Sequence, residues 1–453
     1  MSGWPVEALS SSSPWDAADR VWHGHGATPE IVDAALVEAE SAFPAWAADA
    51  TRRERLQDFA VLLADRRDDI SALLVREAGK VRADAEAEAD LLVKKISVTL
   101  DQGLARTPDR ADANVRWRAR GVAAVLGPYN FPLHLLHGLV VPALAVGCTV
   151  VAKPSERCPA LGDLYGQLLI DAGLDHVCCL VQGGHAVASE LVGDARVRTV
   201  AAVGSRGMGR ALAGMLADRP ETVLALELGG VNHAIVCEDA DLDAAIAAIA
   251  DGAWRMAGQR CTATRVAHLP VSIAERALAL LNDARQRWVP TPDPGGTTGP
   301  MIDARQREDF QRPYRALPEG FELIGGSAGV SPLGSCFAEP LLIAARTEAA
   351  RADERYVEEH FGPALIVDTY VDLDECLARA AANPYRLAAS VFTDSRERFL
   401  ACAARLPYGQ VNHNRPTAGA RSDLPFGGCG LSGNGRPAAV AACAIFADET
   451  VVW

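Results

Sequence analysis

Apolar residues recur at helical spacing through the first hundred residues of the chain. After a polar start, a loose apolar stripe predicts one helix and a cleaner stripe predicts the next, with Pro44 and the polar residues near Thr51 separating the two. The loose stripe consists of Ile31, Ala35, Val37, Ala42 and Trp46, and the cleaner one of Leu56, Phe59, Leu62 and Leu63. A further helix is expected over residues 84–100.

From Gly121 to Leu228 short apolar runs alternate with helical patterns. The predicted strands cover residues 122–126, 149–152, 177–181, 199–203 and 223–227. This alternation predicts a parallel, doubly wound sheet, in which a ligand crevice lies at the carboxyl ends of the strands. A second series of helices and strands follows, with strands at 234–237, 364–367 and 390–392 and a helix at 242–254.

Residues 115–120 differ from both series, because apolar and basic residues alternate there with a period of two. Such alternation is typical of a strand with one exposed face. An exposed strand is a candidate arm for pairing with another subunit.

The composition describes an ordinary globular protein. A chain of 453 residues exceeds what one hydrophobic core usually supports, so two or three subdomains are expected. Apolar residues make up 49% and charged residues 23% of the chain, which excludes a disordered protein. The net charge of −14 argues against nucleic acid or an anionic membrane as partner, and an acidic substrate would need local arginines.

The eleven cysteines are scattered and odd in number. Met1–Pro5 lacks the features of a secretory signal, and no apolar stretch reaches the length of a membrane span. Reduced thiols in a cytoplasmic protein are therefore expected. The adjacent Cys178 and Cys179 lie in an apolar run, which favours a buried strand over a metal site, and no spacing in the chain resembles a zinc ligand set.

Cys261, in the run Gly258-Gln259-Arg260-Cys261-Thr262, is the strongest candidate for a catalytic residue. A thiol is a strong nucleophile toward a carbonyl carbon, and the carboxylate of Glu227 can activate water to release the acyl group that the thiol captures. Together the two residues suggest covalent catalysis on an aldehyde. The neighbouring Arg260 could lower the pKa of the thiol, although an outward or structural arginine explains it equally well.

Two strand ends carry residues suited to a dinucleotide. Lys153 and Glu156 can hydrogen-bond ribose hydroxyls, and Glu156 would repel the 2′-phosphate of NADP and so favours NAD. Taken alone, a surface Lys–Glu pair is the commoner explanation of these two residues. The turn from Gly204 and Ser205 to Gly209 would let backbone N–H groups and a helix N-terminus approach a pyrophosphate, although an ordinary βα turn explains it as well.

Asn130 lies in the loop Gly127-Pro128-Tyr129-Asn130-Phe131-Pro132, directly after a predicted strand. Its side-chain amide could donate to a developing oxyanion, and removing one such donor typically costs about 2.7–4 kcal/mol of transition-state stabilisation. Most Pro-Asn loops only shape a turn. The role of Asn130 therefore depends on what lies around it.

Seven spaced motifs, in their order along the chain, resemble those of the aldehyde dehydrogenase superfamily. The resemblance covers roughly residue 30 to the C-terminus. The motifs are Asn130, Lys153-Pro154-Ser155-Glu156, Gly204-Ser205, Glu227-Leu228-Gly229-Gly230, Cys261, Glu359-His360-Phe361-Gly362-Pro363 and Pro425-Phe426-Gly427-Gly428.

The resemblance implies an α/β fold of the aldehyde dehydrogenase type in three parts. These would be a Rossmann-type NAD-binding domain (residues 1–100 and 121–228), an αβ catalytic domain (229–433) and a β oligomerisation arm (101–120 and 434–453). A homodimer or larger homo-oligomer is implied. No metal is implied.

The resemblance also implies the role of each site residue. Cys261 would attack the aldehyde, Asn130 and the backbone N–H of Cys261 would hold the oxyanion, and Glu227 would activate water. Glu359 would bind the nicotinamide-side ribose of NAD, with Phe361 beside the ring. Arg421 and Phe426 would line the substrate mouth, Arg421 as the partner of an anionic aldehyde.

A narrower resemblance is to the branch that oxidises N-succinylglutamate 5-semialdehyde in bacterial arginine catabolism. Its motifs here are the loop of residues 127–132, Val181-Gln182-Gly183-Gly184, Ala257-Gly258-Gln259-Arg260-Cys261-Thr262 and the C-terminal run from Val411 to Pro437. The chain departs from the family pattern at Ala202-Val203, at Leu139, where many members carry lysine, and in an N-terminal region that looks shortened.

Three alternatives stay open. A broader-specificity aldehyde or semialdehyde dehydrogenase would need the same motifs. Acyl transfer to coenzyme A is disfavoured by Glu227, because the acyl-transferring branch usually lacks that carboxylate. A dinucleotide-binding scaffold without catalysis is disfavoured by the joint presence of Cys261, Glu227 and Asn130.

Overall fold

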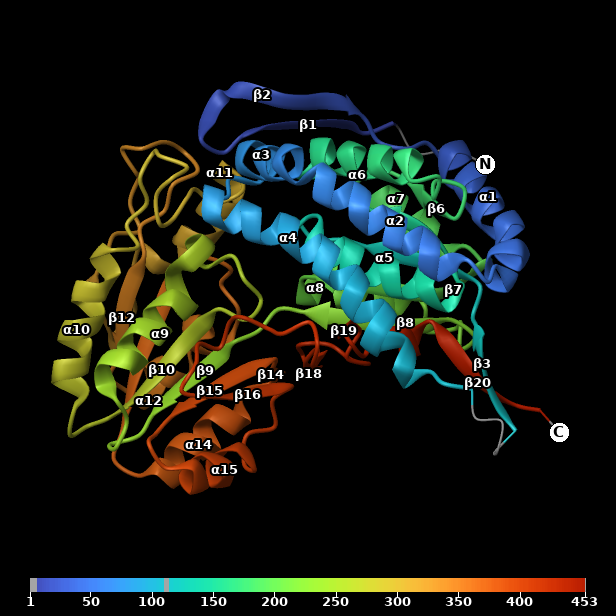
Figure 1. Ribbon diagram of the computed structural model, residues 1–453. Helices are drawn as coiled ribbons and strands as arrows, with labels where there is room; N and C mark the ends of the chain where they lie inside the picture. The colour runs from blue at the N-terminus through green and yellow to red at the C-terminus, as the bar shows by residue number, and fades with distance from the viewer. Residues whose placement is uncertain (1–5, 110–113, 453) are drawn as a thin grey trace.

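A five-stranded parallel sheet forms the centre of the first half of the chain (Figure 1). In this computed structural model, which describes residues 6–109 and 114–452, the strand order is β6-β5-β4-β7-β8. The strands are β4 (Val122–Leu126), β5 (Thr149–Lys153), β6 (Cys178–Leu180), β7 (Val197–Gly204) and β8 (Val223–Leu228). All five predicted strands are confirmed, and so is their parallel arrangement. Cys178, in β6, is buried as predicted.

Helices cover both faces of this sheet, because successive residues of each strand point to opposite sides. Ala123 and Val125 of β4 face a core formed with α2 to α6, whereas Ala124 and Leu126 face a core formed with α1, α7 and α8. The bounds of the covering helices are α1 (Pro29–Ala48), α2 (Arg52–Asp65), α3 (Arg67–Ala78), α4 (Arg82–Val98), α5 (His134–Val146), α6 (Pro159–Asp171), α7 (His185–Gly193) and α8 (Arg206–Met215). Strands buried in this way read as continuous apolar runs, which is why the pattern identified them.

The face that the first helix buries differs in part from the predicted one. Val32 and Leu36 are buried in α1, whereas Ile31 is 52% and Val37 50% exposed, so the predicted stripe is wrong at these two positions. It is confirmed at Trp46, which is buried, and at Ala35 and Ala42, which pack partly buried against the cores. The cleaner stripe on α2 is confirmed, with Leu56 and Phe59 among its buried residues.

Pro44 lies inside α1 and does not end it, contrary to prediction. Proline removes one backbone hydrogen bond, to the carbonyl of Glu40. Both residues are on the exposed side of the helix, where water can satisfy that carbonyl. The predicted helix at 84–100 corresponds to α4, which is followed by a π turn (Thr99–Gly103) and a 3-10 turn (Leu104–Arg106).

An antiparallel hairpin of β1 (Ala8–Ser13) and β2 (Asp16–His25) lies across α3 and α6 (Figure 1). Every second residue of β1 is buried, but two of these, Ser11 and Ser13, are polar. Ser11 donates a hydrogen bond to the buried carboxylate of Glu77. A polar inward face carries no hydrophobic alternation, which is why the hairpin was not predicted.

A seven-stranded sheet organises the second half, in the order β11-β12-β13-β10-β9-β15-β16. Only β11 runs antiparallel to its neighbour. The strands are β9 (Asn232–Val236), β10 (Thr264–Pro270), β11 (Phe321–Gly325), β12 (Leu341–Ala345), β13 (Ala364–Tyr370), β15 (Ala388–Phe392) and β16 (Gln410–His413). The three predicted strands of this series and the helix at 242–254 are confirmed as β9, β13, β15 and α9 (Leu242–Trp254). The sequence pattern missed β10, whose buried residues include the polar Thr264, Arg265 and His268.

Helices again cover both faces of the second sheet. One face packs on α9 and α10, and part of the other on α14 and α15. The remaining helices and turns are α10 (Ala274–Gln286), α11 (Ala304–Gln311), α12 (Glu348–Ala352), α13 (Glu354–Val357), α14 (Leu373–Ala382), α15 (Arg396–Ala403) and the 3-10 turns Arg255–Gly258, Arg312–Tyr314 and Ala442–Ile445. Two short pairs, β14 (Tyr385–Arg386) with β18 (Cys429–Gly430) and β17 (Pro425–Phe426) with β19 (Ala438–Ala439), complete the fold.

The predicted strand at 115–120 is confirmed as β3 (Val115–Ala119), and β20 (Ala447–Val451) of the same chain pairs with it. The two form an antiparallel ribbon at the periphery of the molecule (Figure 1). Arg120 and Asp448 add an ion pair of 2.6 Å. Parts of three predicted segments, at 1–5, 110–113 and Trp453, lie outside the described residues.

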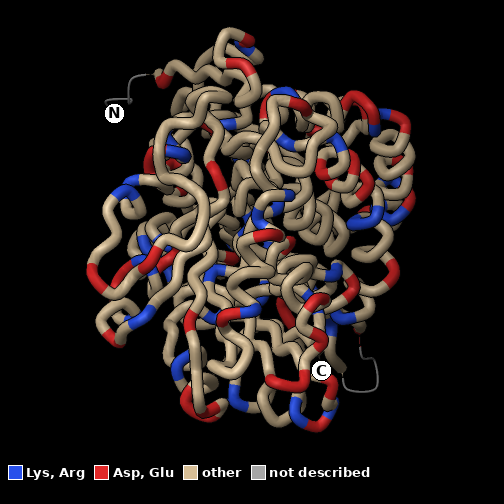
Figure 2. The backbone as a smooth tube through the Cα atoms, turned by 90° about the vertical axis from the view of Figure 1, so that its left-hand side faces the viewer, with Lys and Arg blue, Asp and Glu red and all other residues tan. Residues whose placement is uncertain are grey.

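Charged residues of both signs are interspersed on the side of the molecule seen in Figure 2. Within residues 6–109 and 114–452, no helix combines the length and apolar character needed to cross a bilayer.

The burial on α1 predicts opposite outcomes for two apolar residues of one helix. Leu36→Ala should lower the free energy of unfolding by about 2–5 kcal/mol, because Leu36 is 1% exposed in the core and its truncation leaves a cavity. Ile31→Ala should change it by less than about 0.5 kcal/mol. Denaturant titrations of both variants measure the difference, and equal losses would contradict the assigned helix face.

Candidate active site

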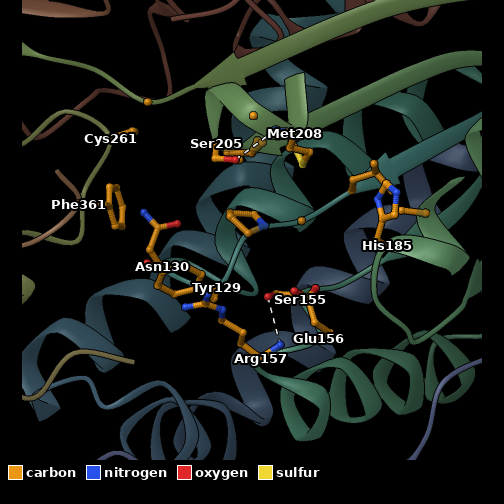
Figure 3. Close-up of a pocket in the computed structure, with 18 of the residues that line it drawn as sticks. Tyr129, Asn130, Ser155, Glu156, Arg157, His185, Ser205, Met208, Cys261 and Phe361 are labelled. Atoms are coloured by element: carbon orange, nitrogen blue, oxygen red, sulfur yellow. Dashed lines mark hydrogen bonds between the residues drawn. The ribbon is translucent and has the colours of Figure 1, made fainter. Parts of the chain in front are cut away.

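A cavity of about 750 Å³ opens at the carboxyl ends of β4, β5, β7 and β8 (Figure 3). The segments that follow these strands line one side, and Cys261, Glu359 and Phe361 from the second half line the other. Strand order reverses between β4 and β7, which is where open α/β sheets bind ligands. The predicted crevice is therefore confirmed.

The loop that carries Cys261 is held by hydrogen bonds to its backbone carbonyls. Asn232 Nδ2 donates to the carbonyl oxygens of Cys261 and Ala263, each at 2.8 Å. Arg260 donates to the carbonyls of Asp251 and Gly252. The guanidinium of Arg260 is thus bound to backbone, which supports its structural interpretation over a role in lowering the pKa of the thiol.

Gly258 permits the sharp entry into this loop. Its φ is +65°, and a Cβ there would lie 2.2 Å from the carbonyl oxygen of Gly362. The preceding Met256 and Ala257 also adopt left-handed φ angles, which are strained for residues with a side chain. The backbone just before Cys261 is therefore held by its surroundings rather than by local preference.

Glu227 lies near the end of β8 and is 1% exposed. Neither of its carboxylate oxygens has a hydrogen-bond partner within the described ranges, although the Cys261 thiol is close enough to affect the acid. The pKa of Glu227 is raised to about 8, mainly by burial. The Cys261 thiol lowers this pKa, and the charge of Glu359 adds to its rise. A carboxyl group with a pKa near neutrality is suited to general base catalysis.

Cys261 lines the cavity and is half-buried. Its surroundings raise the pKa of the thiol well above the ordinary value, first through burial and then through the negative charges of Glu227 and Glu359. The resting side chain is therefore a thiol. A base must remove its proton before it can act as a nucleophile, and Glu227 is adjacent to it.

Asn130 reaches the same place from the loop after β4. It is 8% exposed, and its Nδ2 donates to the carbonyl of Gln259 at 3.0 Å, two residues before Cys261. Figure 3 shows its amide on the side of the cavity where Cys261 and Phe361 lie. The fold thus brings together the three predicted catalytic residues from three distant segments of the chain.

Lys153 lies at the end of β5 and is 6% exposed, so it does not belong to a surface pair. Its Nζ donates to the carbonyl of Gly183 at 2.7 Å and lies 3.4 Å from Glu156 Oε2. Burial lowers the pKa of Lys153. Glu156 is more exposed, and both residues line the cavity.

The N-terminus of α8 faces the cavity with Gly204 and Ser205. Ser205 is the N-cap, and its Oγ accepts a hydrogen bond from the backbone N–H of Met208 (Figure 3). Gly209 does not line the cavity. A Cβ on Gly209 would lie 2.6 Å from Leu228 Cδ1, so this glycine lets α8 pack closely against β8.

Glu359 and Phe361 close the opposite side. Glu359 Oε1 accepts the backbone N–H of Gly230 at 3.0 Å, and burial raises the pKa of this acid to about 7. A Cβ on Gly229 would lie 1.8 Å from Glu359 Oε2, so only glycine leaves room for the carboxylate. The ring of Phe361 meets that of Tyr129 edge to face at 6.0 Å.

The two predicted substrate residues have different surroundings. Phe426 is buried and packs with Leu387 in a small cluster that contacts Cys261. Arg421 is exposed, does not line the cavity, and its guanidinium forms a double hydrogen bond with Asp423. Its charge is therefore already matched by a carboxylate.

Several residues that build the site carried no recognisable sequence signal. Asn232 holds the nucleophile loop, and Arg157 packs over the Tyr129 ring at 4.8 Å. Glu88 accepts the N–H groups of Leu133 and His134 and so fixes the loop that carries Asn130. Each acts across the fold, and its spacing along the chain follows no motif. In the described part of the chain, no cluster of three His, Cys, Asp or Glu residues is arranged to hold a metal ion.

The chain belongs to the aldehyde dehydrogenase family, whose family model matches residues 5–452. It is 39% identical over 432 residues to N-succinylglutamate 5-semialdehyde dehydrogenase 1 of Caulobacter vibrioides. The aligned residues make up 90% of this chain and 88% of that protein. It is 36% identical to N-succinylglutamate 5-semialdehyde dehydrogenase of Burkholderia thailandensis, over 93% of this chain and 88% of that protein.

The crystal structure of a Pseudomonas syringae aldehyde dehydrogenase C variant, in complex with NAD+ and octanal, is similar to the fold. The TM-score is 0.92 at 27% identity, over 98% of this chain and 93% of that chain. Both the family resemblance and the α/β fold class inferred from the sequence are confirmed.

Proposed function

We propose that this protein oxidises an aldehyde to a carboxylate with NAD, through a thioester on Cys261. The observation that carries the proposal is the convergence of Cys261, Glu227 and Asn130 at one end of the cavity. A nucleophile, a buried carboxyl group beside it and an amide donor meet there.

The residues around the cavity fit NAD. The N-terminus of α8, with Gly204 and Ser205, suits a pyrophosphate because its N–H groups and dipole attract anions. Lys153 and Glu156 suit the hydroxyls of one ribose and Glu359 those of the other, with Phe361 beside the nicotinamide ring. The negative charge of Glu156 disfavours the additional phosphate of NADP. When bound, NAD supplies the acceptor for the hydride that leaves the aldehyde carbon.

The remaining chemistry falls to the protein. Glu227 accepts the proton of the Cys261 thiol, and the sulfur attacks the aldehyde carbon. Asn130 Nδ2 carries two hydrogens, of which one is bound to Gln259, so the second is available to the oxyanion together with the backbone N–H of Cys261. Glu227 releases this first proton to solvent and then takes a proton from the water that hydrolyses the thioester. The Cys261 sulfur leaves the product carboxylate as a thiolate, which takes up the proton from Glu227.

The substrate that we propose is N-succinylglutamate 5-semialdehyde, which places the reaction in arginine catabolism. The support is the identity of 36–39% over nine-tenths of the chain to enzymes named for that substrate. The alternative is a broader-specificity aldehyde or semialdehyde dehydrogenase. Arg421 remains a candidate for substrate binding at the mouth of the site.

We also propose a division of the chain into three functional parts. Residues 1–100 and 121–228 would bind NAD, residues 229–433 would supply the catalytic loop, and residues 101–120 and 434–453 would join subunits into at least a dimer. The exposed ribbon of β3 and β20 supports this arm. All eleven cysteines are free, which supports a reducing, cytoplasmic location.

The first prediction of this proposal concerns the acid at the reaction centre. Glu227→Gln should lower steady-state kcat about 10²- to 10⁴-fold, because general base catalysis of thioester hydrolysis is lost. The pre-steady-state release of NADH should be slowed as well, because Glu227 also accepts the proton of the Cys261 thiol. In the unaltered enzyme kcat should rise as pH is raised through about 8, since only the carboxylate form accepts a proton. Absorbance at 340 nm measures NADH formation in the variant and across the pH series. Cys261→Ser is the control and should produce no NADH.

The second concerns the substrate. We expect kcat/KM for N-succinylglutamate 5-semialdehyde to exceed that for glutamate semialdehyde and for propanal, measured under one set of conditions. Equal values would favour the broader-specificity alternative.

Arg421→Gln should raise KM for the anionic substrates more than for propanal, because the variant loses the charge that would bind a carboxylate. Equal effects on both kinds of substrate would remove Arg421 from the site.

The third concerns the subunits. Light scattering at micromolar concentration should give at least twice the mass of one chain. Val451→Asp should shift the protein toward the monomer, because Val451 is 54% exposed on β20. Val371→Asp, at a residue that is 91% exposed and follows β13, should leave the mass unchanged. A monomeric mass for the unaltered chain would contradict the arm.

A further inference from the structure

Lys95 of α4 is a buried cation without a protein partner. It is 5% exposed, and none of the residues that the structure describes forms a hydrogen bond or an ion pair with its ammonium group. Burial alone lowers the pKa of Lys95 to about 8. Nearby Lys80 is equally buried but pairs with Glu88 at 2.8 Å. An unpaired buried charge destabilises a fold, so its presence needs a reason other than stability.

The side chain of Lys95 extends across α5 over Gly138. A Cβ on Gly138 would lie 3.2 Å from Lys95 Cε and 3.6 Å from Nζ. Any larger residue at position 138 would crowd the ammonium group. Gly138 lies in the second turn of α5, the helix that follows the loop carrying Asn130.

A second nitrogen group without a partner lies at the start of α5. His134 Nδ1 is buried and has no hydrogen-bond partner among the described residues. Burial and the charge of Lys95 hold the pKa of His134 well below its ordinary value, so the ring is neutral. The imidazole meets the ring of Phe131, the residue after Asn130, at 6.1 Å. Two nitrogen groups that have no hydrogen-bond partner among the described residues thus lie near α5.

The same end of α4 faces the loop next to Cys261. The charge of Lys94 contributes to lowering the pKa of Asp423, which places that turn of α4 near the loop. Phe426, three residues later, packs in the cluster that contacts Cys261. Neither Lys95 nor His134 lines the cavity proposed for NAD. Both residues lie near α5 instead, and the turn of α4 that carries Lys95 approaches the loop of residues 421–426.

We infer that Lys95, with His134 beside it, binds a carboxylate of an anionic aldehyde. Lys95 is then a specificity-determining residue. The inference rests on the proposed function only in that an aldehyde must reach Cys261. A carboxylate would supply the counter-charge that the fold withholds from Lys95, and His134 could donate a further hydrogen bond. Arg421 is less suited to this task, because Asp423 already pairs with it.

The test compares two aldehydes of equal chain length, 5-oxopentanoate and pentanal, in Lys95→Met. The ratio of their KM values, anionic over neutral, should rise at least about tenfold, which is the expected effect of losing one charge-assisted hydrogen bond. Lys94→Met is the matched control, since Lys94 is adjacent but exposed, and its ratio should stay within about twofold of the unaltered enzyme. Lys95→Arg should recover part of the preference.

A readout without turnover separates this inference from the proposed function. Glutarate binding, measured by calorimetry, should weaken at least about tenfold in Lys95→Met and not in Lys94→Met. The thermal midpoint of Lys95→Met should be unchanged or higher, because a buried unpaired charge is removed; a purely structural lysine would give a lower one. If Lys95→Met does not fold, Lys95→Gln replaces it in every measurement.

The outcomes are distinct. Lys95-dependent glutarate binding without oxidation of any aldehyde would overturn the proposed function and leave the anion site standing. Aldehyde oxidation with an unchanged KM ratio and unchanged glutarate binding in Lys95→Met would overturn the anion site alone.

Discussion

The hydrogen bond from Asn130 to the carbonyl of Gln259 joins the two halves of the protein at the point where we propose that the chemistry takes place. One partner follows a strand of the first sheet and the other precedes the nucleophile in the second half. Two further contacts cross the same boundary, Arg206 with Glu358 at 2.9 Å and the N–H of Leu228 with the carbonyl of Ser432 at 3.0 Å. Without this docking neither half contains a complete site.

Docking also creates the electrostatics of the site. Glu227 and Glu359 come from opposite halves of the chain, and both line the cavity. Burial raises the pKa of both acids toward neutrality and that of the Cys261 thiol well beyond it. In water these groups would have ordinary pKa values, so their reactivity is a property of the assembled fold. The position of Glu227 next to the thiol makes it the natural proton acceptor.

Two buried lysines on neighbouring segments have different roles: one stabilises a loop, and the other is the proposed anion-binding residue. Lys80 is neutralised by Glu88, which also fixes the Asn130 loop through two backbone N–H groups. Lys95 lies further along the same helix as Glu88, and within residues 6–109 and 114–452 no carboxylate pairs with it. The first arrangement fixes a loop, and the second leaves an attraction available to a ligand. Proteins commonly accept such local instability where a partner is to be bound.

The sequence alone determined the first sheet and the family of this protein. The strands of the first sheet are apolar on both faces, and the catalytic trio stands in motifs whose order along the chain identifies the family. Tertiary structure decided what depends on neighbours distant in sequence. Ile31 is exposed because α1 packs through Val32 and Leu36, and β1 is a strand in which the hydroxyl of the buried Ser11 donates to Glu77. Such contacts have no periodicity along the chain, because the fold alone brings their partners together.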